Sequence, residues 1–310
     1  MLKPRALRPG DRIAVIAPAS PFRAEDFYAG LAELRALGFE PHYDERVFER
    51  SGFLAGTAAL RAAAARDALH DPSVAAIIAA RGGYGSVEML PLLDPREISE
   101  ARKPIIGYSD VTSLLTFVTQ QCGLVAFHGP SVAGRLGRGQ AGYDRRSFLA
   151  ALCEASPLGP LSSPCTETLR AGTAAGLLFG GTLTQLVASL GTPFAFDPPP
   201  GHVLLLDEVN ERPYRLHRML TQLRLAGILG RAAAIVFGEM PGCDEPGGRP
   251  TAREAVLDAL ATFEGAVLVG FSTGHTAHPA LTVPLGVTTR VEATADAARV
   301  VVEEPAVDAA

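Results

Sequence analysis

Residue types that hydrolytic enzymes use as nucleophile, base and acid lie beside turns of this 310-residue sequence. Ser109 lies in GYSDVT, His275 lies in STGHTAHPA, and Asp207 and Glu208 follow the apolar run HVLLL. A serine hydroxyl attacks a carbonyl carbon when a histidine removes its proton and a carboxylate orients that histidine. These residues therefore predict acyl transfer, provided that the fold brings them together.

The turn around Ser109 has two interpretations. The apolar run KPII is followed by GYSD and then by an amphipathic pattern, so Ser109 can cap a helix without taking part in any chemistry. GYSDVT also lacks the second glycine of the G-x-S-x-G turn. As a nucleophile, Ser109 needs an exposed hydroxyl on a tight strand-to-helix turn, with the N–H of Asp110 facing a substrate oxygen. The local sequence favours the cap.

His275 is the histidine best placed to act as a base, because it follows the apolar run VLVGF and a turn of small residues. With His278 it forms an H-x-x-H spacing, which occurs in metal sites. This segment has no helical pattern, contains Pro279 and has no carboxylate nearby in the sequence, so we expect no metal site. We expect His128, in AFHGPS, to line the same cleft without acting as the base.

Asp207 and Glu208 are the candidates for the acid that orients the histidine. They follow a fully apolar strand, where period-two alternation directs them to opposite faces, so only one of them can face a site. Either carboxylate can instead pair with Arg212, Arg215 or Arg218. The residues alone leave the choice open.

The glycine-rich segment AARGGYGSVEML follows another apolar run. It matches neither the phosphate-binding loop G-x-x-x-x-G-K-[ST] nor the dinucleotide fingerprint. An N–H of Gly82 or Gly83 can complete an oxyanion hole with the N–H of Asp110, since glycine allows close backbone approach. A plain turn is equally compatible with this segment.

Composition limits the partners of the chain. The net charge of −5 provides no basic surface for nucleic acid or for an anionic membrane, so a small molecule is the expected partner. The four cysteines have neither a C-x-x-C pair nor zinc-finger spacing, which favours a reducing compartment. We find no signal peptide and no apolar run long enough to span a membrane, and therefore expect a soluble, cytoplasmic protein.

Strand and helix patterns alternate in the first half of the chain. Strands are predicted over 12–19, 40–45, 74–80 and 103–108, with helices over 23–38 and 56–71. This alternation predicts an α/β fold with a mainly parallel sheet flanked by helices, in which ligands bind at the carboxyl ends of the strands. The segments APAS, ARGGYG and GYSD stand at these ends.

A proline-rich segment without periodicity divides the chain. We predict an N-terminal domain over 1–154, which contains the candidate nucleophile Ser109, a linker over 155–172, and a C-terminal α/β or α+β domain over 173–310. The last domain has strand patterns at 202–209 and 232–240, helix patterns at 213–227 and 252–263, and a terminal hairpin pattern at 287–304.

The motifs APAS, RGGYG, GYSD, FHGP, GGTL, DEVNERPYRLHRML and GHTAHPALTVPLG, in this order, resemble the LD-carboxypeptidase (muramoyltetrapeptide carboxypeptidase) family over nearly the whole chain. The resemblance implies that Ser109 is the nucleophile and His275 the general base. The family's acid opens a Glu-Asp pair, and counting back from NERP places Asp207 at that position. Asp207 is therefore the expected acid and Glu208 the alternative. An aspartate is one methylene shorter and requires closer approach to the histidine.

The resemblance further implies a cleft between the two domains, with acid and base supplied by the second domain. It implies that a serine peptidase removes the terminal D-alanine from a cytoplasmic muropeptide tetrapeptide in peptidoglycan recycling, with oxyanion contacts from Asp110 and Gly82 or Gly83. It also implies a homodimer and no requirement for a metal or an organic cofactor.

Two other functions are compatible with the same motifs. A related branch, the microcin C immunity-type peptidases, acts on acyl-adenylate conjugates and is expected to present an aromatic platform to adenine. This chain has no tryptophan, which argues against that substrate. In a non-catalytic muropeptide-binding protein, Ser109 would be only a helix cap.

Overall fold

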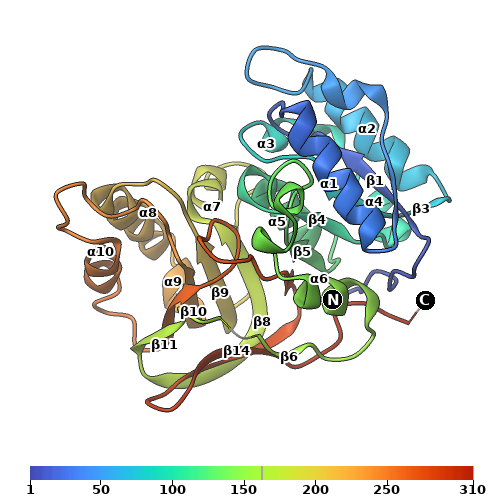
Figure 1. Ribbon diagram of the computed structural model, residues 1–310. Coiled ribbons are helices and arrows are strands. Elements are labelled where there is room, and N and C mark those ends of the chain that lie inside the picture. Colours follow the sequence, from blue (N-terminus) through green and yellow to red (C-terminus); the bar gives the residue numbers. More distant parts are fainter. Residues whose placement is uncertain (162, 310) are drawn as a thin grey trace.

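The computed structural model describes residues 1–161 and 163–309, which form two α/β domains (Figure 1). Each domain is built on one β-sheet. The first sheet has six strands in the order β12-β5-β4-β3-β1-β2, and the second has eight in the order β6-β14-β13-β8-β9-β10-β11-β7. The two-domain α/β architecture expected from the sequence is confirmed.

The first domain contains the predicted parallel sheet. Its strands are β1 (Arg12–Ile16), β2 (Glu40–His42), β3 (Val74–Ala79), β4 (Ile105–Gly107), β5 (Ala126–His128) and β12 (Val283–Leu285). Its helices are α1 (Ala24–Ala36), α2 (Ala58–His70), α3 (Ser86–Met89), α4 (Pro95–Ala101), α5 (Thr112–Gln120) and α6 (Arg145–Cys153). The 3-10 helices are η1 (Glu45–Phe48), η2 (Leu90–Leu92), η3 (Ser109–Val111) and η4 (Leu136–Ala141). The pairs among β1 to β5 are parallel, and β12 runs antiparallel to β5.

The second domain contains a mixed sheet. Its strands are β6 (Gly159–Leu161), β7 (Glu167–Arg170), β8 (Gly172–Thr182), β9 (His202–Asp207), β10 (Ala232–Gly238), β11 (Ala266–Phe271), β13 (Thr288–Ala293) and β14 (Ala298–Val302). Its helices are α7 (Leu183–Ser189), α8 (Pro213–Leu225), α9 (Ile228–Arg231) and α10 (Ala252–Ala259). Strands β8 to β11 are parallel, whereas β13 and β14 form the predicted antiparallel hairpin.

Local signals explain where several helices begin. Thr57 accepts a hydrogen bond from the N–H of Leu60 at the start of α2. Pro213 occupies the first turn of α8, where its missing N–H has no intrahelical partner to lose. Thr251 and Glu254 form a capping box at the start of α10.

The segment 155–172 is not the simple linker that its composition suggested. It contains β6 and β7, which form the two opposite edges of the second sheet, while residue 162 lies outside the described residues. Edge strands pair on one side only and tolerate proline and polar residues, as Pro160 in β6 illustrates. The irregular sequence therefore conceals strands.

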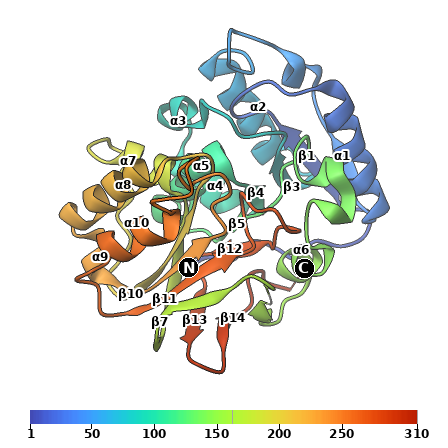
Figure 2. The same ribbon diagram turned by 60° about the vertical axis from the view of Figure 1, so that its left-hand side comes forward.

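The boundary predicted at residue 173 also does not separate the two sheets. Strand β12 comes from the C-terminal part of the chain but pairs with β5 of the first sheet, with Val283 opposite His128 (Figure 2). Near the termini, Arg5 forms a bridge with Asp308. The last residue, 310, lies outside the described residues. The C-terminal segment thus ties the two domains together.

Strand β9 lies between two apolar cores. Val203 and Leu205 belong to a cluster continuous with the core of the first domain, whereas Leu204 and Leu206 pack in a second cluster with α7, α8 and α10. This alternation places Asp207 on the face directed toward the first domain. No helix in the described part of the chain has the length and apolar character needed to cross a membrane.

Candidate active site

A cavity of about 430 Å³ is lined by residues from both domains. Ser109, Gly82 and Gly83 come from loops at the carboxyl ends of β4 and β3, and His275 comes from the loop after β11. Tyr108 also lines the cavity, and its ring centroid lies 5.1 Å from that of His275. The predicted nucleophile, base and glycine loop therefore face one space.

Ser109 occupies a tight turn between β4 and α5. Its φ of +64° lies in the left-handed region, which a non-glycine residue adopts at a cost of about 1–3 kcal/mol. Helix α5 begins at Thr112, and among the described residues the Ser109 side chain makes no capping hydrogen bond at either η3 or α5. The strained turn presents the hydroxyl to the cavity instead of using it as a helix cap.

Gly82 lies directly against this turn. A Cβ atom on Gly82 would lie 2.8 Å from Cβ of Ser109, 3.1 Å from its Oγ and 3.3 Å from the backbone nitrogen of Asp110. Gly83 has a φ of +112°, and a Cβ there would lie 2.4 Å from Oγ of Ser20 in the APAS segment. Both positions require glycine because the three loops meet without space for a side chain.

Asp110 joins the glycine loop to the serine turn. Its carboxylate accepts hydrogen bonds from the N–H groups of Gly85 at 3.2 Å and Ser86 at 2.8 Å. The Ser86 hydroxyl donates in return to the carbonyl oxygen of Asp110 at 2.6 Å. The sequence suggested only a role for the N–H of Asp110, whereas its side chain also fixes the loop opposite Ser109.

Arg61 supports the same loops from helix α2, and sequence reasoning missed it. It is 1% exposed and donates to the carbonyl oxygens of Pro18 at 2.7 Å and Gly85 at 2.5 Å. Its other terminal nitrogen lies 2.5 Å from Oε2 of Glu88. A buried arginine is rare without such partners, but the alanine-rich helix sequence contains no signal for these contacts.

His275 is held by Asp207. The Asp207 Oδ2 atom lies 2.8 Å from Nδ1 of His275, and its Oδ1 accepts the backbone N–H of the same residue at 2.9 Å. Gly274 permits this approach, because a Cβ there would lie 2.3 Å from Oδ2 of Asp207. With Nδ1 bound to the carboxylate, Nε2 is the ring nitrogen left to exchange protons.

Glu208 points elsewhere, as the alternation of β9 requires. Its Oε2 accepts hydrogen bonds from the N–H of Thr184 at 2.9 Å and from the hydroxyl of Thr184 at 2.6 Å, near the start of α7. Its Oε1 accepts the N–H of Val209 at 3.0 Å. Of the two candidate acids, Asp207 is the one in contact with His275.

Two threonines connect the serine helix to the acid. The N–H of Thr182 donates to Oγ1 of Thr112 at 3.0 Å, and the hydroxyl of Thr182 donates to Oδ2 of Asp207 at 3.2 Å. Gly181 makes room for Thr112, since a Cβ at residue 181 would lie 2.6 Å from its Oγ1. The GGTL motif thus has a physical role that the sequence alone did not reveal.

The electrostatic environment favours an ionised acid beside a basic imidazole. Burial raises the pKa of Asp207, but the hydrogen bonds and charge of His275 outweigh burial, so that its pKa lies below the ordinary value. Burial lowers the pKa of His275, but the hydrogen bond and charge of Asp207, together with the charge of Glu208, raise its pKa above the ordinary value.

Arg135 holds the loop that carries His275, a contact that no motif in the sequence indicated. Its Nη2 donates to the carbonyl oxygens of Gly274 at 2.8 Å and Thr276 at 2.7 Å, on either side of His275. Arg135 belongs to the first domain, so this contact also sets the histidine loop relative to the serine turn.

His128 does not line the cavity as expected. It is fully buried, and burial lowers its pKa to about 4. Neither ring nitrogen has a hydrogen-bond partner among the described residues, and a Cβ at Gly274 would lie 2.7 Å from its Nε2. His128 is a neutral packing neighbour behind the Asp207–His275 pair.

His278 has a carboxylate partner that its local sequence did not show. Its Nδ1 lies 3.0 Å from Oε1 of Glu239. The other carboxylate oxygen of Glu239, Oε2, accepts a hydrogen bond from the N–H of Ala277 at 2.9 Å. Within the described residues, no three histidine, cysteine, aspartate or glutamate side chains group as a metal site would require. The two histidines of the H-x-x-H spacing thus contact different carboxylates, His275 that of Asp207 and His278 that of Glu239.

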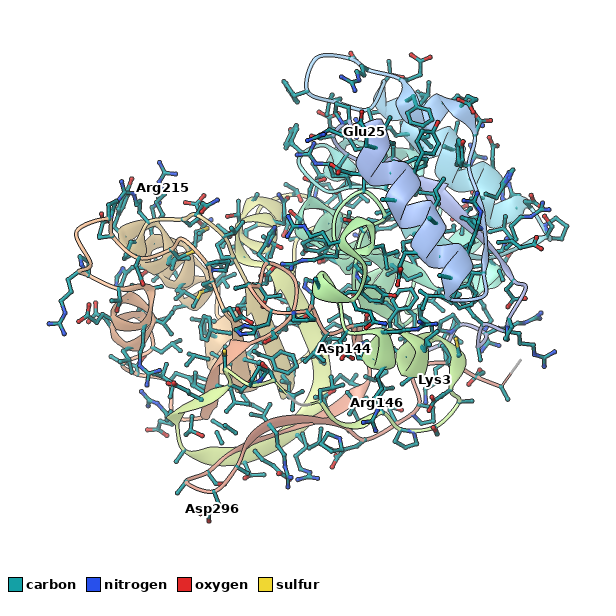
Figure 3. All side chains as sticks on the ribbon, in the orientation of Figure 1. Lys3, Glu25, Asp144, Arg146, Arg215 and Asp296 are labelled. Atoms are coloured by element: carbon teal, nitrogen blue, oxygen red, sulfur yellow. The ribbon has the colours of Figure 1, made fainter. Side chains whose placement is uncertain are left out.

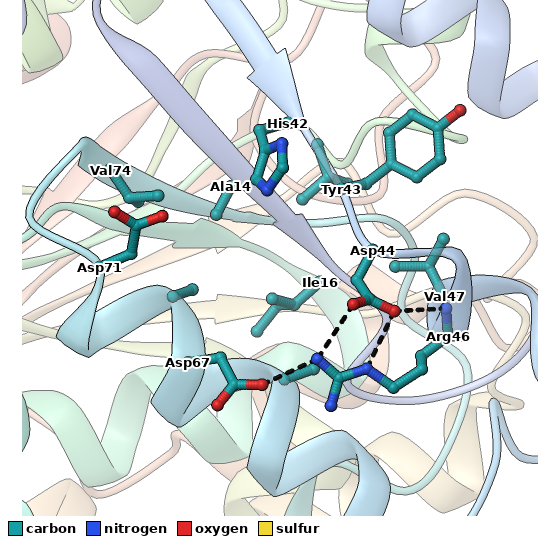
Figure 4. A pocket seen from close by; sticks show the side chains of 13 residues that line it. Ala14, Ile16, His42, Tyr43, Asp44, Arg46, Val47, Asp67, Asp71 and Val74 are labelled. Atoms are coloured by element: carbon teal, nitrogen blue, oxygen red, sulfur yellow. Dashed lines mark hydrogen bonds and ion pairs between the residues drawn. The ribbon is translucent and has the colours of Figure 1, made fainter.

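A smaller cavity of about 110 Å³ lies beside β1, β2 and α2 (Figure 4). Arg46 bridges two carboxylates in it, with Nε 2.9 Å from Oδ1 of Asp44 and Nη2 2.7 Å from Oδ2 of Asp67. No serine, cysteine or lysine is among the described residues that line it. Among the described lining residues, Arg46 faces three aspartates, Asp44, Asp67 and Asp71, so the cavity keeps a net negative charge and offers no nucleophile for acyl transfer.

Two family models match the chain. The LD-carboxypeptidase N-terminal domain matches residues 13–129, which include Ser109, and the LD-carboxypeptidase C-terminal domain matches residues 175–291, which include Asp207 and His275. A serine and a histidine that line one cavity between two domains, with a buried carboxylate bound to the histidine, are typical of a hydrolase. The chain belongs to the LD-carboxypeptidase family.

Relatives extend this assignment over most of the chain. A Bacillus subtilis protein described as a probable murein peptide carboxypeptidase is 34% identical over 293 residues, covering 92% of this chain and 89% of the relative. The murein tetrapeptide carboxypeptidase of Pseudomonas aeruginosa is 34% identical over 238 residues, covering 75% and 77%. The structure of MccF in complex with glutamyl sulfamoyl guanosine superposes with a TM-score of 0.90, covering 99% of this chain and 100% of that chain at 22% identity. This last similarity establishes the fold.

Proposed function

We propose that the protein is a serine peptidase that removes the terminal D-alanine from a muropeptide tetrapeptide, an L,D-carboxypeptidase reaction of peptidoglycan recycling. One observation carries the proposal: His275, bound to Asp207 at 2.8 Å, lines the same cavity as the strained Ser109. The names of the Bacillus and Pseudomonas relatives support the substrate class.

The proposed reaction has two chemical steps. In the first, Nε2 of His275 removes the proton of Ser109 while Oγ bonds to the scissile carbonyl carbon. The C–N bond then breaks, His275 returns the proton to the leaving amine of D-alanine, and the tripeptide remains esterified to Ser109. In the second, water attacks the ester, gives a proton to His275, and releases the tripeptide as Ser109 takes that proton back.

The oxyanion formed in both steps needs donors in fixed positions. The N–H of Asp110 lies close to Gly82, and the N–H groups of Gly82 and Gly83 do not donate to other backbone groups within the described residues. We assign the N–H of Asp110 and that of Gly82 or Gly83 to this role. Each such donor contributes about 10²–10³-fold to kcat in other hydrolases.

Turnover of a tetrapeptide ending in D-alanine tests the proposal. The wild-type protein should release D-alanine, Ser109→Ala and His275→Ala should lose at least 10³-fold in kcat, and both variants should keep the wild-type melting temperature within a few degrees. Full activity of Ser109→Ala would refute the mechanism. Binding without turnover by the wild-type protein would identify a muropeptide-binding protein.

An aminoacyl sulfamoyl adenosine serves as the competing substrate in the same assay, because the fold is shared with MccF. The absence of tryptophan from this chain favours the peptide. The family resemblance also supports a cytoplasmic homodimer, which cell fractionation and light scattering would test.

A further inference from the structure

The active-site cavity is positively charged although the whole chain carries a net charge of −5. The described residues that line it include three arginines, Arg23, Arg81 and Arg138, but only one carboxylate, that of Asp26. A concave surface lined by one sign of charge concentrates ligands of the opposite sign. The cavity is therefore suited to an anionic substrate, and the arginines differ in how free they are to bind it.

Most arginines near His275 already have partners. Arg135 uses Nη2 on the carbonyl oxygens of Gly274 and Thr276, and Nη1 of Arg81 donates to the carbonyl oxygen of Pro21 at 2.6 Å. Arg23 lies 3.6 Å from a carboxylate oxygen of Glu25 on the exposed start of α1. In contrast, the guanidinium of Arg138 has no hydrogen-bond or ion-pair partner among the described residues.

Arg138 lines two adjoining cavities, both of which are also lined by His275. It lines the 430 Å³ cavity that contains Ser109 and His275. It also lines an adjoining cavity of about 220 Å³, which contains His275 and Thr276 but not Ser109. The scissile carbonyl must lie at Ser109, so the second cavity extends beyond the base, where the leaving group departs.

The reaction fixes how far this leaving group can lie from the base. His275 must reach the departing nitrogen at hydrogen-bond distance, about 3 Å, to protonate it. In an amino acid the carboxylate carbon is two bonds from that nitrogen, about 2.5 Å away. The terminal carboxylate therefore lies within one arginine side-chain length of His275. Arg138 lines both cavities beside His275, and its guanidinium has no partner among the described residues.

The backbone that carries Arg138 is held in place. It belongs to η4, whose Gly137 lies so close to α1 that a Cβ would be 2.7 Å from the carbonyl oxygen of Asp26. A Cβ at Gly142 would lie 2.1 Å from the carbonyl oxygen of Arg135. Close packing on both sides of Arg138 limits the backbone motion that would otherwise oppose binding.

We propose that Arg138 binds the C-terminal carboxylate of the peptide substrate and thereby restricts hydrolysis to the last residue of a free C-terminus. The guanidinium fork matches a carboxylate with two parallel hydrogen bonds, which a neutral C-terminal amide cannot replace. This inference rests on the proposed function and adds the group that selects a terminal substrate.

The test compares a tetrapeptide ending in D-alanine with the same peptide ending in D-alanine amide, for the wild-type protein, Arg138→Gln, Arg138→Lys and Arg146→Gln. Arg146 lies on α6, is exposed and lines none of these cavities, which makes it a matched control (Figure 3). We expect the wild type and Arg146→Gln to prefer the acid by about 100-fold in kcat/KM. Arg138→Gln should lose about 100-fold on the acid and no more than about threefold on the amide, and Arg138→Lys should be intermediate because it keeps a point charge.

A preference for the acid that survives in Arg138→Gln overturns the inference, as does equal wild-type cleavage of acid and amide. A protein that cleaves neither peptide refutes the proposed function instead. In that case calorimetric binding of both peptides to Ser109→Ala and to the Ser109→Ala/Arg138→Gln double variant decides about Arg138. Loss of acid-selective binding in the double variant supports the assignment, and unchanged selectivity overturns it.

Discussion

Replacing Asp207 by asparagine removes the charge beside His275 and preserves the size of the side chain. The two carboxylate oxygens accept hydrogen bonds from Nδ1 and the backbone N–H of His275, and from the hydroxyl of Thr182. Asparagine has only one oxygen for these donors. If its NH₂ faces Nδ1, the ring proton must move to Nε2, which can then no longer accept the proton of Ser109. If its NH₂ instead faces the backbone N–H of His275, two hydrogen-bond donors point at each other and that hydrogen bond is lost.

Either orientation disables the base. In serine hydrolases this substitution lowers kcat by about 10⁴-fold, equivalent to about 5.4 kcal/mol of transition-state stabilisation. The matched control is Glu208→Gln, which removes one buried charge at the next residue, where Thr184 and Val209 are the partners. We expect Glu208→Gln to keep kcat within about fivefold and to lose about 1–2 kcal/mol of unfolding free energy.

The assay follows free D-alanine from the tetrapeptide under single-turnover and steady-state conditions, with thermal melting of each variant measured in parallel. An Asp207→Asn variant that stays within tenfold of the wild-type kcat would refute the assignment of the acid. A Glu208→Gln variant that loses as much activity as Asp207→Asn, with an unchanged melting temperature, would also refute it.

Three further outcomes are expected. Only neutral His275 accepts a proton, and its pKa is raised, so kcat/KM should increase with pH through a midpoint above the ordinary histidine pKa. This midpoint should move to lower pH in Asp207→Asn, as measured from the pH dependence of kcat/KM. Gly82→Ala should lower kcat at least 100-fold and the free energy of unfolding by about 1–3 kcal/mol, because its Cβ would lie 2.8 Å from Cβ of Ser109. Activity near wild type would show that the loop moves to make room for the methyl group. Arg61→Met should lower the free energy of unfolding by about 3 kcal/mol in denaturant titrations, since two loop carbonyls and a carboxylate lose a buried cation, and a change below 0.5 kcal/mol would contradict this.

Patterns of neighbouring residues predicted much of the fold. The helices at α1, α2, α8 and α10 and strands β1 to β4 of the first sheet follow from periodicity and capping residues that act over a few positions, whereas the three-residue strand β5 was not predicted. The edge strands β6 and β7 escaped prediction because strands that pair on one side need no apolar alternation. Strand β12 escaped it because its pairing with β5 joins segments about half the chain apart.

Local motifs likewise identified some residues of the site, whereas others were identified only from the three-dimensional structure. The turns around Ser109 and His275 carry local motifs, so both residues were identified before their contacts were known. Arg61, Arg135 and Thr182 were not, because the hydrogen-bond partners of each lie at least 24 positions away in the sequence. The burial of His128 likewise depends on strands that cover it from other parts of the chain.

The sequence by itself determined the class of elements, the candidate nucleophile and base, and the family, since these depend on residue types at short, ordered spacings. Only the tertiary structure decided which of two adjacent carboxylates meets His275. Alternation along β9 requires Asp207 and Glu208 to lie on opposite faces of the second sheet. Which of these faces packs against the first domain is decided by how the two sheets are arranged. That packing is a property of the whole chain.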